Sequence, residues 1–159
     1  MFTKFKDFFK EKTLTNKLQY VTDNGVEEYT QDELDDNLFD AIDKNDYVTF
    51  VDMIERGANI NKVKEYGSDR IWTPLTSCLY SDGSNQIKFL KYLINSGVEL
   101  FGNKIYSFDE IEEVDIYGDI NTLIFDKKDK QEIMNCILKK HPDFMEEREM
   151  RMKSNKYNL

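Results

Sequence analysis

Residues 50–61 read Phe-Val-Asp-Met-Ile-Glu-Arg-Gly-Ala-Asn-Ile-Asn, and this stretch decides the fold that the sequence predicts. Phe50, Met53 and Ile54 follow one another at helical spacing, so they share one face of a helix. Gly57 comes one turn later and can end the helix in the left-handed conformation, which glycine adopts without steric cost. The stretch therefore predicts a helix with one buried face and a defined end.

The same order of apolar residues and a stop recurs twice further along the chain. Gly97 stands 40 residues after Gly57, and His141 takes the stop position 44 residues after Gly97. Such self-similarity is the sequence signature of a stacked repeat architecture. A shorter apolar segment precedes each of these helices, so each repeat is predicted to hold two helices. The further triplets are Leu90, Leu93 and Ile94, and then Met134, Ile137 and Leu138.

The first helix of the second repeat has the clearest start. Thr73 is a natural N-cap, and Pro74 suits the first helical position because its missing N–H loses no hydrogen bond there. Leu75 is then expected to face inward, and the small Cys78 suits a close approach of two helices. The corresponding segments are Leu38, Ala41 and Ile42 in the first repeat and Thr122, Leu123, Ile124 and Phe125 in the third.

Two of these motifs resemble the ankyrin repeat family. Arg56-Gly57-Ala58-Asn59-Ile60-Asn61 is similar to the family's helix-ending motif. Thr73-Pro74-Leu75 is similar to its opening motif, although Thr76 stands where the family prefers histidine. The resemblance spans residues 34–144 and implies stacked helix-turn-helix units that bind another protein. Looser counterparts of the ending motif are Ser96-Gly97-Val98-Glu99-Leu100 and Lys140-His141-Pro142-Asp143-Phe144.

The segments outside the repeats are predicted to cap the stack. Residues 1–12 place phenylalanines at helical spacing among lysines, which is typical of an amphipathic helix that packs on the protein or lies on a membrane. Asn24-Gly25 between two alternating segments indicates a β-hairpin. Thr30 and Glu33 fit a capping box that starts a helix. Residues 145–159 predict a charged terminal helix whose methionines cap the last repeat.

The sequence thus predicts one mainly α-helical domain. Its central part is an ankyrin-like stack of about three helix-turn-helix repeats with long loops between them, preceded by a short N-terminal helix and a β-hairpin. The predicted division is residues 1–33 for that helix and hairpin, 34–144 for the repeats (34–61, 72–100 and 121–144), and 145–159 for the tail.

Composition favours binding of a basic partner. The 159 residues include 31 Asp and Glu against 22 Lys and Arg, and the net charge of −9 repels nucleic acid and anionic membranes. The alternative is that this charge serves solubility alone. Cys78, Cys136 and the single His141 form neither a disulfide framework nor a metal site, and both thiols are expected to be buried. We expect a cytoplasmic protein without signal peptide, membrane span, cofactor or metal.

Two long connections, residues 62–71 and 101–120, are the expected binding segments. Loops longer than about 12 residues in a compact domain are usually functional or disordered. Tyrosine rings supply contact area, and carboxylates recognise Lys or Arg. The alternative for 101–120 is a solvated acidic insertion with a short helix over residues 108–114. The candidate partner-binding residues are Tyr66, Asp69, Trp72, Tyr80, Tyr106, Asp109, Glu110, Glu112, Glu113, Asp115 and Tyr117.

A second acidic zone lies between Asp23 and Asn59. There the alternatives are a negative helix face that binds a partner and a face that is merely solvated. The acidic side chains of its first helix are Asp32, Glu33, Asp35, Asp36, Asp40 and Asp43.

These features predict a non-catalytic protein-binding module, because the sequence has no glycine-rich phosphate loop and no clear acid–base pair. The leading hypothesis is an inhibitor that covers a basic surface of one protein partner and is a monomer when free. Examples are an immunity protein against a basic, nuclease-type toxin and an inhibitor encoded by a phage or pathogen. The alternatives are a structural adaptor or subunit in a larger cytoplasmic assembly, and membrane attachment through residues 2–9.

Overall fold

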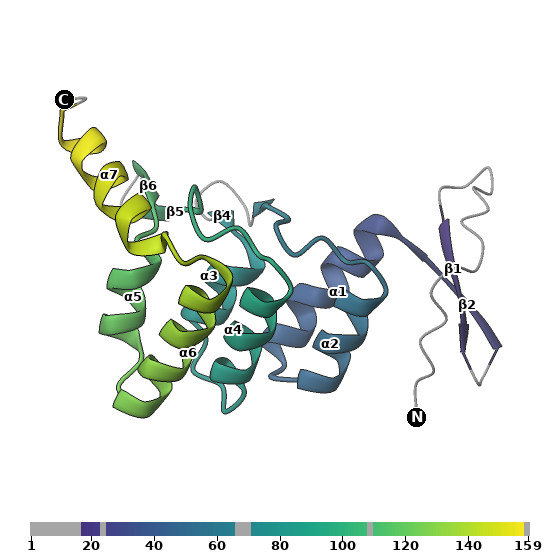
Figure 1. The fold of residues 1–159 in the computed structure, drawn as a ribbon. Helices are drawn as coiled ribbons and strands as arrows, with labels where there is room; N and C mark the ends of the chain where they lie inside the picture. The colour runs from purple at the N-terminus through teal and green to yellow at the C-terminus, as the bar shows by residue number, and fades with distance from the viewer. Residues whose placement is uncertain (1–16, 23–24, 66–70, 108–109, 158–159) are drawn as a thin grey trace.

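The computed structural model of the chain describes residues 17–22, 25–65, 71–107 and 110–157, so the predicted helix over residues 1–12 lies outside it. The described part is mainly helical, as the sequence predicts (Figure 1). Consecutive helices form pairs, and a terminal helix follows the last pair. The helices are α1 (Gln31–Asp43), α2 (Tyr47–Glu55), α3 (Pro74–Leu79), α4 (Gln86–Asn95), α5 (Ile116–Leu123), α6 (Lys127–Lys140) and α7 (Phe144–Tyr157).

The helices stack in two layers. The first helix of each pair contacts the first helix of the next, which gives the layer α1–α3–α5. The second helices α2, α4 and α6 contact one another in the same way (Figure 1). An amphipathic helix must bury its apolar face against a neighbour, and repeated triplets make this neighbour another repeat. The stacked pairs are therefore the arrangement that the periodic sequence requires.

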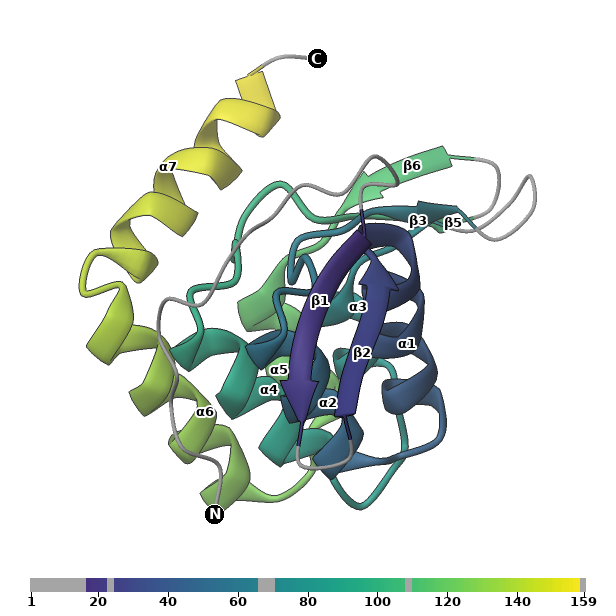
Figure 2. The same cartoon turned by 90° about the vertical axis from the view of Figure 1, so that its right-hand side faces the viewer.

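The long connections contain β-hairpins. In the described residues the strands form three separate two-stranded antiparallel sheets. Two of these hairpins follow the first and second helix pairs, and they reach sideways on the α1 and α3 side of the stack (Figure 2). The short helix considered over residues 108–114 is wrong, because residues 110–113 form a strand. The strands are β1 (Lys17–Thr22), β2 (Gly25–Thr30), β3 (Lys64–Glu65), β4 (Ile71–Trp72), β5 (Lys104–Ser107) and β6 (Glu110–Glu113).

The hairpin predicted before the first repeat is present. Strand β1 pairs with β2 in a register that places Thr22 opposite Gly25. Gly25 is thus the first residue of β2, and its φ of 123° lies in the region that glycine favours. Strand β2 contacts α1, so the hairpin extends the stack at its N-terminal end, where Figure 1 shows it on the right.

The core runs through all three helix pairs. Helix α1 buries its predicted face of Leu34, Leu38, Ala41 and Ile42. Between the first two pairs the rings of Phe50 and Phe89 are both fully buried, with centroids 4.5 Å apart. Burial of one such ring contributes on the order of 1.5–3 kcal/mol. The residues of the third pair that complete the core are Ile116, Ile120, Ile133 and Ile137.

Local signals in the first two pairs are confirmed. Thr30 and Glu33 form the reciprocal capping box at the start of α1. Thr73 caps α3, with Pro74 at its first turn and Cys78 fully buried. Gly57 and Gly97 end α2 and α4 with φ of 101° and 86°. These glycines reverse the chain at a conformation that other residues adopt only with strain.

Hydrogen bonds join equivalent positions of successive pairs. Asn45 accepts a bond from the backbone N–H of Asn85 at 3.0 Å, and its carbonyl accepts one from the Asn85 side chain at 2.8 Å. Asn61 likewise accepts a bond from the backbone N–H of Glu99 at 2.9 Å. The spacing of 40 residues equals the interval between Gly57 and Gly97, and the spacing of 38 residues is close to it. Polar contacts therefore repeat with the same period as the apolar triplets.

The third pair differs from its prediction. Helix α5 starts at Ile116, inside the segment interpreted as a connection, and not near residue 121. The side chain of Phe125 is 92% exposed and belongs to no helix. Helix α6 buries Ile133 and Ile137, while Leu138 is 38% exposed. The apolar period was hard to see because α5 contributes only two buried residues between acidic ones.

Helix α7 also departs from expectation. Phe144 is buried at its first turn and stacks on Phe101, with ring centroids 5.1 Å apart. The rest of α7 leads away from the stack (Figure 1). The prediction that methionines cap the last repeat is wrong, because Met145, Met150 and Met152 are exposed. A single aromatic residue provides the apolar contact instead.

Candidate protein interface

Two of the predicted contact residues, Trp72 and Tyr80, meet in one aromatic pair. Trp72 ends β4, and Tyr80 is the C-cap of α3. Because α3 has only six residues, large side chains flanking it can touch along its length. Their rings meet edge to face, with centroids 5.6 Å apart and planes at 78°. Trp72 is partly buried and Tyr80 is 40% exposed, so the pair offers rigid contact area to a partner.

Asp119 extends this pair onto α5. The Tyr80 hydroxyl donates a hydrogen bond of 3.2 Å to Oδ2 of Asp119. Burial raises the pKa of Asp119, the Tyr80 hydrogen bond lowers it, and the charge of Asp115 raises it further. No Lys or Arg of the described residues forms an ion pair with this carboxylate. Asp119 is thus a half-buried anion whose one hydrogen-bond donor among those residues is a neutral hydroxyl.

Asp115 and Tyr117, also predicted to bind a partner, already bind this chain's own arginine. Nε of Arg148 donates to Oδ1 of Asp115 at 2.7 Å, and the second guanidinium nitrogen donates to Oδ2. The Arg148 guanidinium also lies over the Tyr117 ring, 4.6 Å from its centroid. The hydrogen bond from Arg148 lowers the pKa of Asp115, against a smaller opposite effect of burial. These two residues tie α5 to α7, so a partner would have to displace Arg148 to reach them.

Glu113 has a similar role beside them. Its carboxylate accepts a bond from the backbone N–H of Gly102 at 3.1 Å and lies 3.7 Å from a guanidinium nitrogen of Arg151. Arg151 in turn lies over the Phe101 ring, 4.7 Å from its centroid. Glu113 and Asp115 therefore hold α7 against the stack.

The remaining predicted residues are only partly described. Tyr66, Asp69 and Asp109 lie outside the described residues. For Tyr106, Glu110 and Glu112 the structure describes the backbone alone, which belongs to the β5–β6 hairpin. Tyr106 pairs with Ile111 and Glu112 with Ile105 in its register.

The acidic face predicted for α1 is largely neutralised. Asp35 is only 2% exposed and accepts a hydrogen bond of 2.7 Å from the backbone N–H of Asn59, so it closes the first repeat internally. Ion pairs of other acids on α1 join Asp32 to Lys62, Asp36 to Lys64 and Asp40 to Lys44. Lysine ammonium groups therefore offset part of the acidic charge of α1.

Several acidic and aromatic residues lie on or beside the helices of the α1–α3–α5 layer. We call the set formed by Asp36, Asp40, Asp43, Trp72, Tyr80 and Asp119 the inner face. The side hairpins stand at an angle to this layer (Figure 2). Asp119 belongs to the predicted 101–120 binding connection but was not among the candidate contact residues, although Tyr80 and Asp119 are 39 residues apart, close to the repeat spacing. That spacing is the signal that places the two residues on neighbouring repeats.

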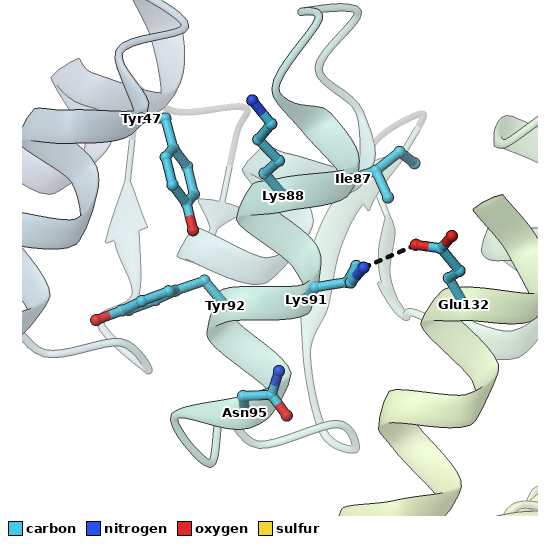
Figure 3. A pocket seen from close by; sticks show the side chains of 7 residues that line it. All are labelled: Tyr47, Ile87, Lys88, Lys91, Tyr92, Asn95 and Glu132. Atoms are coloured by element: carbon cyan, nitrogen blue, oxygen red, sulfur yellow. Dashed lines mark hydrogen bonds and ion pairs between the residues drawn. The ribbon is translucent and has the colours of Figure 1, made fainter.

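A shallow hollow lies on the opposite layer, between α2, α4 and α6 (Figure 3). Tyr47 and Tyr92 line one side of it, and Lys91 forms a 2.7 Å ion pair with Glu132 across the other. The Tyr92 hydroxyl contacts Glu55 at 3.5 Å, and Lys88 lies over the Tyr47 ring. Most polar groups of the hollow are thus engaged in holding the second helices together.

Two further properties of the described residues concern thiol reactivity and the character of the helices. Burial raises the pKa of the Cys78 thiol well above its usual value, which disfavours the reactive thiolate. Cys136 is only partly buried, so the expectation of a fully buried thiol is wrong for it. Among the described helices none has the length and apolar character needed to cross a membrane.

Comparisons with models of protein families, with curated proteins and with solved structures gave no match for this chain.

Proposed function

We propose that this chain is a non-catalytic protein-binding module with ankyrin-like repeats, and that it covers a basic surface of one protein partner. The single observation behind the proposal is the inner face, where the aromatic pair of Trp72 and Tyr80 adjoins the carboxylate of Asp119. Aromatic side chains and arginine-binding acids are the groups that dominate protein interfaces.

The architecture supports the repeat part of the proposal. Each of the first two pairs ends at a left-handed glycine and is followed by a hairpin. Successive pairs are joined by matching asparagine contacts. Repeat proteins of this kind present an extended surface across several helices, and such surfaces suit recognition of another protein. The ankyrin-like motifs of residues 56–61 and 73–75 agree with this arrangement.

Charge supports the choice of a basic partner. The net charge of −9 would accelerate encounter with a positive surface and disfavour nucleic acid. Asp43 is exposed on the inner face, and no ion pair joins it to a cation of the described residues. An inhibitor such as an immunity protein, or one encoded by a phage or pathogen, would use this attraction to reach its target rapidly.

An adaptor or subunit in a larger assembly is the second candidate, and one observation favours it. Phe125, between α5 and α6, is 92% exposed, and Leu138 on α6 is 38% exposed. A permanent partner would cover such side chains. Size-exclusion chromatography with light scattering separates the two candidates, because an inhibitor should be monomeric and an unpartnered subunit should self-associate.

The proposed function is tested by association kinetics. The full chain, carrying an affinity tag, is expressed in its native host, and the proteins that co-purify at low salt are identified and produced separately. Asp43→Asn combined with Asp119→Asn should slow association by about tenfold at low ionic strength and flatten its salt dependence. The matched control, Asp82→Asn with Glu146→Gln, removes the same two charges outside the inner face. Equal slowing by both variants, or a partner that lacks a basic surface, would contradict the proposal.

A further inference from the structure

Helices α4 and α6 carry a surplus of positive charge in an acidic chain. Together their sequences contain seven lysines and only two acids, Asp129 and Glu132. The first helix pair has the opposite character, because α1 and α2 contain eight acids and no base. The whole chain has a net charge of −9, so the layer of second helices differs in sign from the rest. A local surplus of lysine attracts anionic groups.

Two of these lysines line the hollow between α2, α4 and α6 (Figure 3). Lys88 and Lys91 are three residues apart on α4, so they project from the same face of the helix. Lys91 donates to Glu132 at 2.7 Å, and Lys128 lies 4.0 Å from the other oxygen of that carboxylate. An ammonium has three N–H donors, so Lys91 can bind a further acceptor while it holds Glu132. Both ammonium groups can therefore bind a carboxylate that enters the hollow.

Two tyrosine rings form the side of the hollow opposite Glu132 (Figure 3). Tyr47 of α2 and Tyr92 of α4 meet edge to face, with ring centroids 6.3 Å apart and planes at 87°. The Lys88 ammonium lies 5.7 Å from the centroid of the Tyr47 ring. Such rings cover the aliphatic and backbone parts of a bound peptide at a low cost in conformational entropy. The hollow thus combines an aromatic wall with two cations.

The size of the hollow favours a short segment of a protein as its occupant. Its volume is about 450 Å³, within the range of about 300–1,000 Å³ that is typical of ligand sites. A nucleic acid or a membrane extends much further than this hollow. It would also approach Glu55 beside Tyr92 and the other acids of α1 and α2, which repel a large polyanion.

We propose that this hollow binds an acidic segment of a protein, whose carboxylates are held by Lys88 and Lys91. The rings of Tyr47 and Tyr92 cover the stems and backbone of the segment, and the Asn95 amide, one turn after Lys91, hydrogen-bonds to its backbone. Carboxylates two residues apart in an extended segment are separated by about 6–7 Å, comparable to the spacing of about 5–6 Å between neighbours three apart on a helix. The site lies on the layer opposite the inner face and does not depend on the proposed function.

Titration with an acidic peptide tests this inference. The probe is Gly-Glu-Gly-Glu-Gly, acetylated and amidated, added to the full chain at low salt while amide NMR shifts are recorded. We expect saturable shifts around Lys88 and Lys91 in the millimolar range, and none with Gly-Gln-Gly-Gln-Gly. Lys88→Met keeps an aliphatic stem and should weaken binding about three- to fivefold, whereas Lys88→Arg should retain binding. Lys139→Met, an equal charge change on α6 outside the hollow, should leave binding unchanged.

Three outcomes would overturn the inference. Equal weakening by Lys88→Met and Lys139→Met would show that the peptide responds only to overall charge. No saturable shift along α4 would mean that the hollow does not bind acidic segments. Tighter binding of a five-nucleotide oligothymidine at α4 would assign the hollow to nucleic acid. Each result leaves the inner face untested, because the association kinetics of the Asp43→Asn and Asp119→Asn variant address that face separately. Thermal melts of each variant distinguish loss of binding from loss of folding.

Discussion

The N-cap of α5 and the first turn that follows it present the same chemistry in two conditions. At the first, Asp115 binds Arg148 beside Tyr117 and fastens α7 to the stack. At the second, Asp119 accepts a hydrogen bond from Tyr80 beside Trp72 and forms no ion pair within the described residues. The difference teaches that two acidic residues only four positions apart can have different roles. The carboxylate of Asp115 is paired and stabilises the fold, whereas burial of the Asp119 carboxylate is costly.

The largest expected effect comes from removing a core residue next to the second acid. Ile120 is 1% exposed and lies one position after Asp119 on α5. Ile120→Ala should lower the free energy of unfolding by about 3 kcal/mol, because it leaves a cavity under α5. Urea denaturation measures this loss, and Val48→Ala, at a side chain that is 79% exposed, serves as the control. A loss below about 1 kcal/mol would mean that α5 is not packed as described.

Loss of the ion pair between Arg148 and Asp115 should have the next largest effect on stability. Arg148→Ala should lower the free energy of unfolding by about 1–2 kcal/mol, since it removes a two-point hydrogen bond and a ring contact that solvent only partly screens. Lys153→Ala breaks an exposed ion pair with Glu149 on the same helix and should cost far less. If the two variants have equal stabilities, Asp115 does not fasten α7.

Asp119→Asn should change the free energy of unfolding in the opposite direction. Because the folded pKa of Asp119 is raised, its carboxylate destabilises the folded chain once the pH exceeds the unfolded pKa, which has an ordinary value of 3.8. The variant should therefore gain about 0.5 kcal/mol in unfolding free energy at pH 7, and this gain should vanish below about pH 3.8.

Asp115→Asn provides the comparison, because a lowered folded pKa stabilises the chain above the unfolded value and loses that effect as pH falls. Its unfolding free energy should fall at pH 7 by an amount that shrinks below about pH 3.8. Urea denaturation of both variants at several pH values gives the two curves. Curves of the same sign would remove the distinction between Asp115 and Asp119.

The smallest effect concerns the hydroxyl that contacts Asp119. Tyr80→Phe keeps the ring and removes the hydroxyl that donates to this carboxylate, so the pKa of Asp119 should rise further. Stability should change by only about 0.5 kcal/mol. Carboxyl-detected NMR titration measures this pKa directly, with Asp115 as the internal reference. An unchanged pKa of Asp119 would show that the Tyr80 hydrogen bond is absent in solution.

The first two helix pairs were predictable because local signals and periodicity agree there. Thr73-Pro74 starts α3, and Gly57 and Gly97 end α2 and α4 where the apolar triplets stop. Each of these signals depends on residues within one turn of a helix, so sequence alone contains it.

The third pair was predicted poorly because its signals depend on distant residues. Helix α5 is held by Ile116 and Ile120 against α3 and its neighbours, and no glycine marks the end of α6. The two hairpins were missed because strands of two and four residues give almost no alternation to detect.

The sequence predicts which residues are candidates for the site, but not which of them are already paired. Trp72 and Tyr80 stood out as aromatic residues near a connection, and the acids of residues 109–117 stood out by charge. Which acid is already paired depends on Arg148, a residue 33 positions after Asp115 in a different helix. Only the three-dimensional packing of α7 distinguishes Asp115 from Asp119.

The central claim is that the inner face binds a basic protein, and site-specific photo-crosslinking tests it most directly. Benzoylphenylalanine replaces Tyr80 on the inner face in one variant and Phe125, which is 92% exposed outside that face, in the other. Both full chains are irradiated in the native host, and the crosslinked peptides are identified by mass spectrometry. We predict one dominant partner crosslinked from position 80 through an arginine-rich segment, and little crosslinking of it from position 125. Equal crosslinking from both positions, or an acidic segment at position 80, would contradict the account.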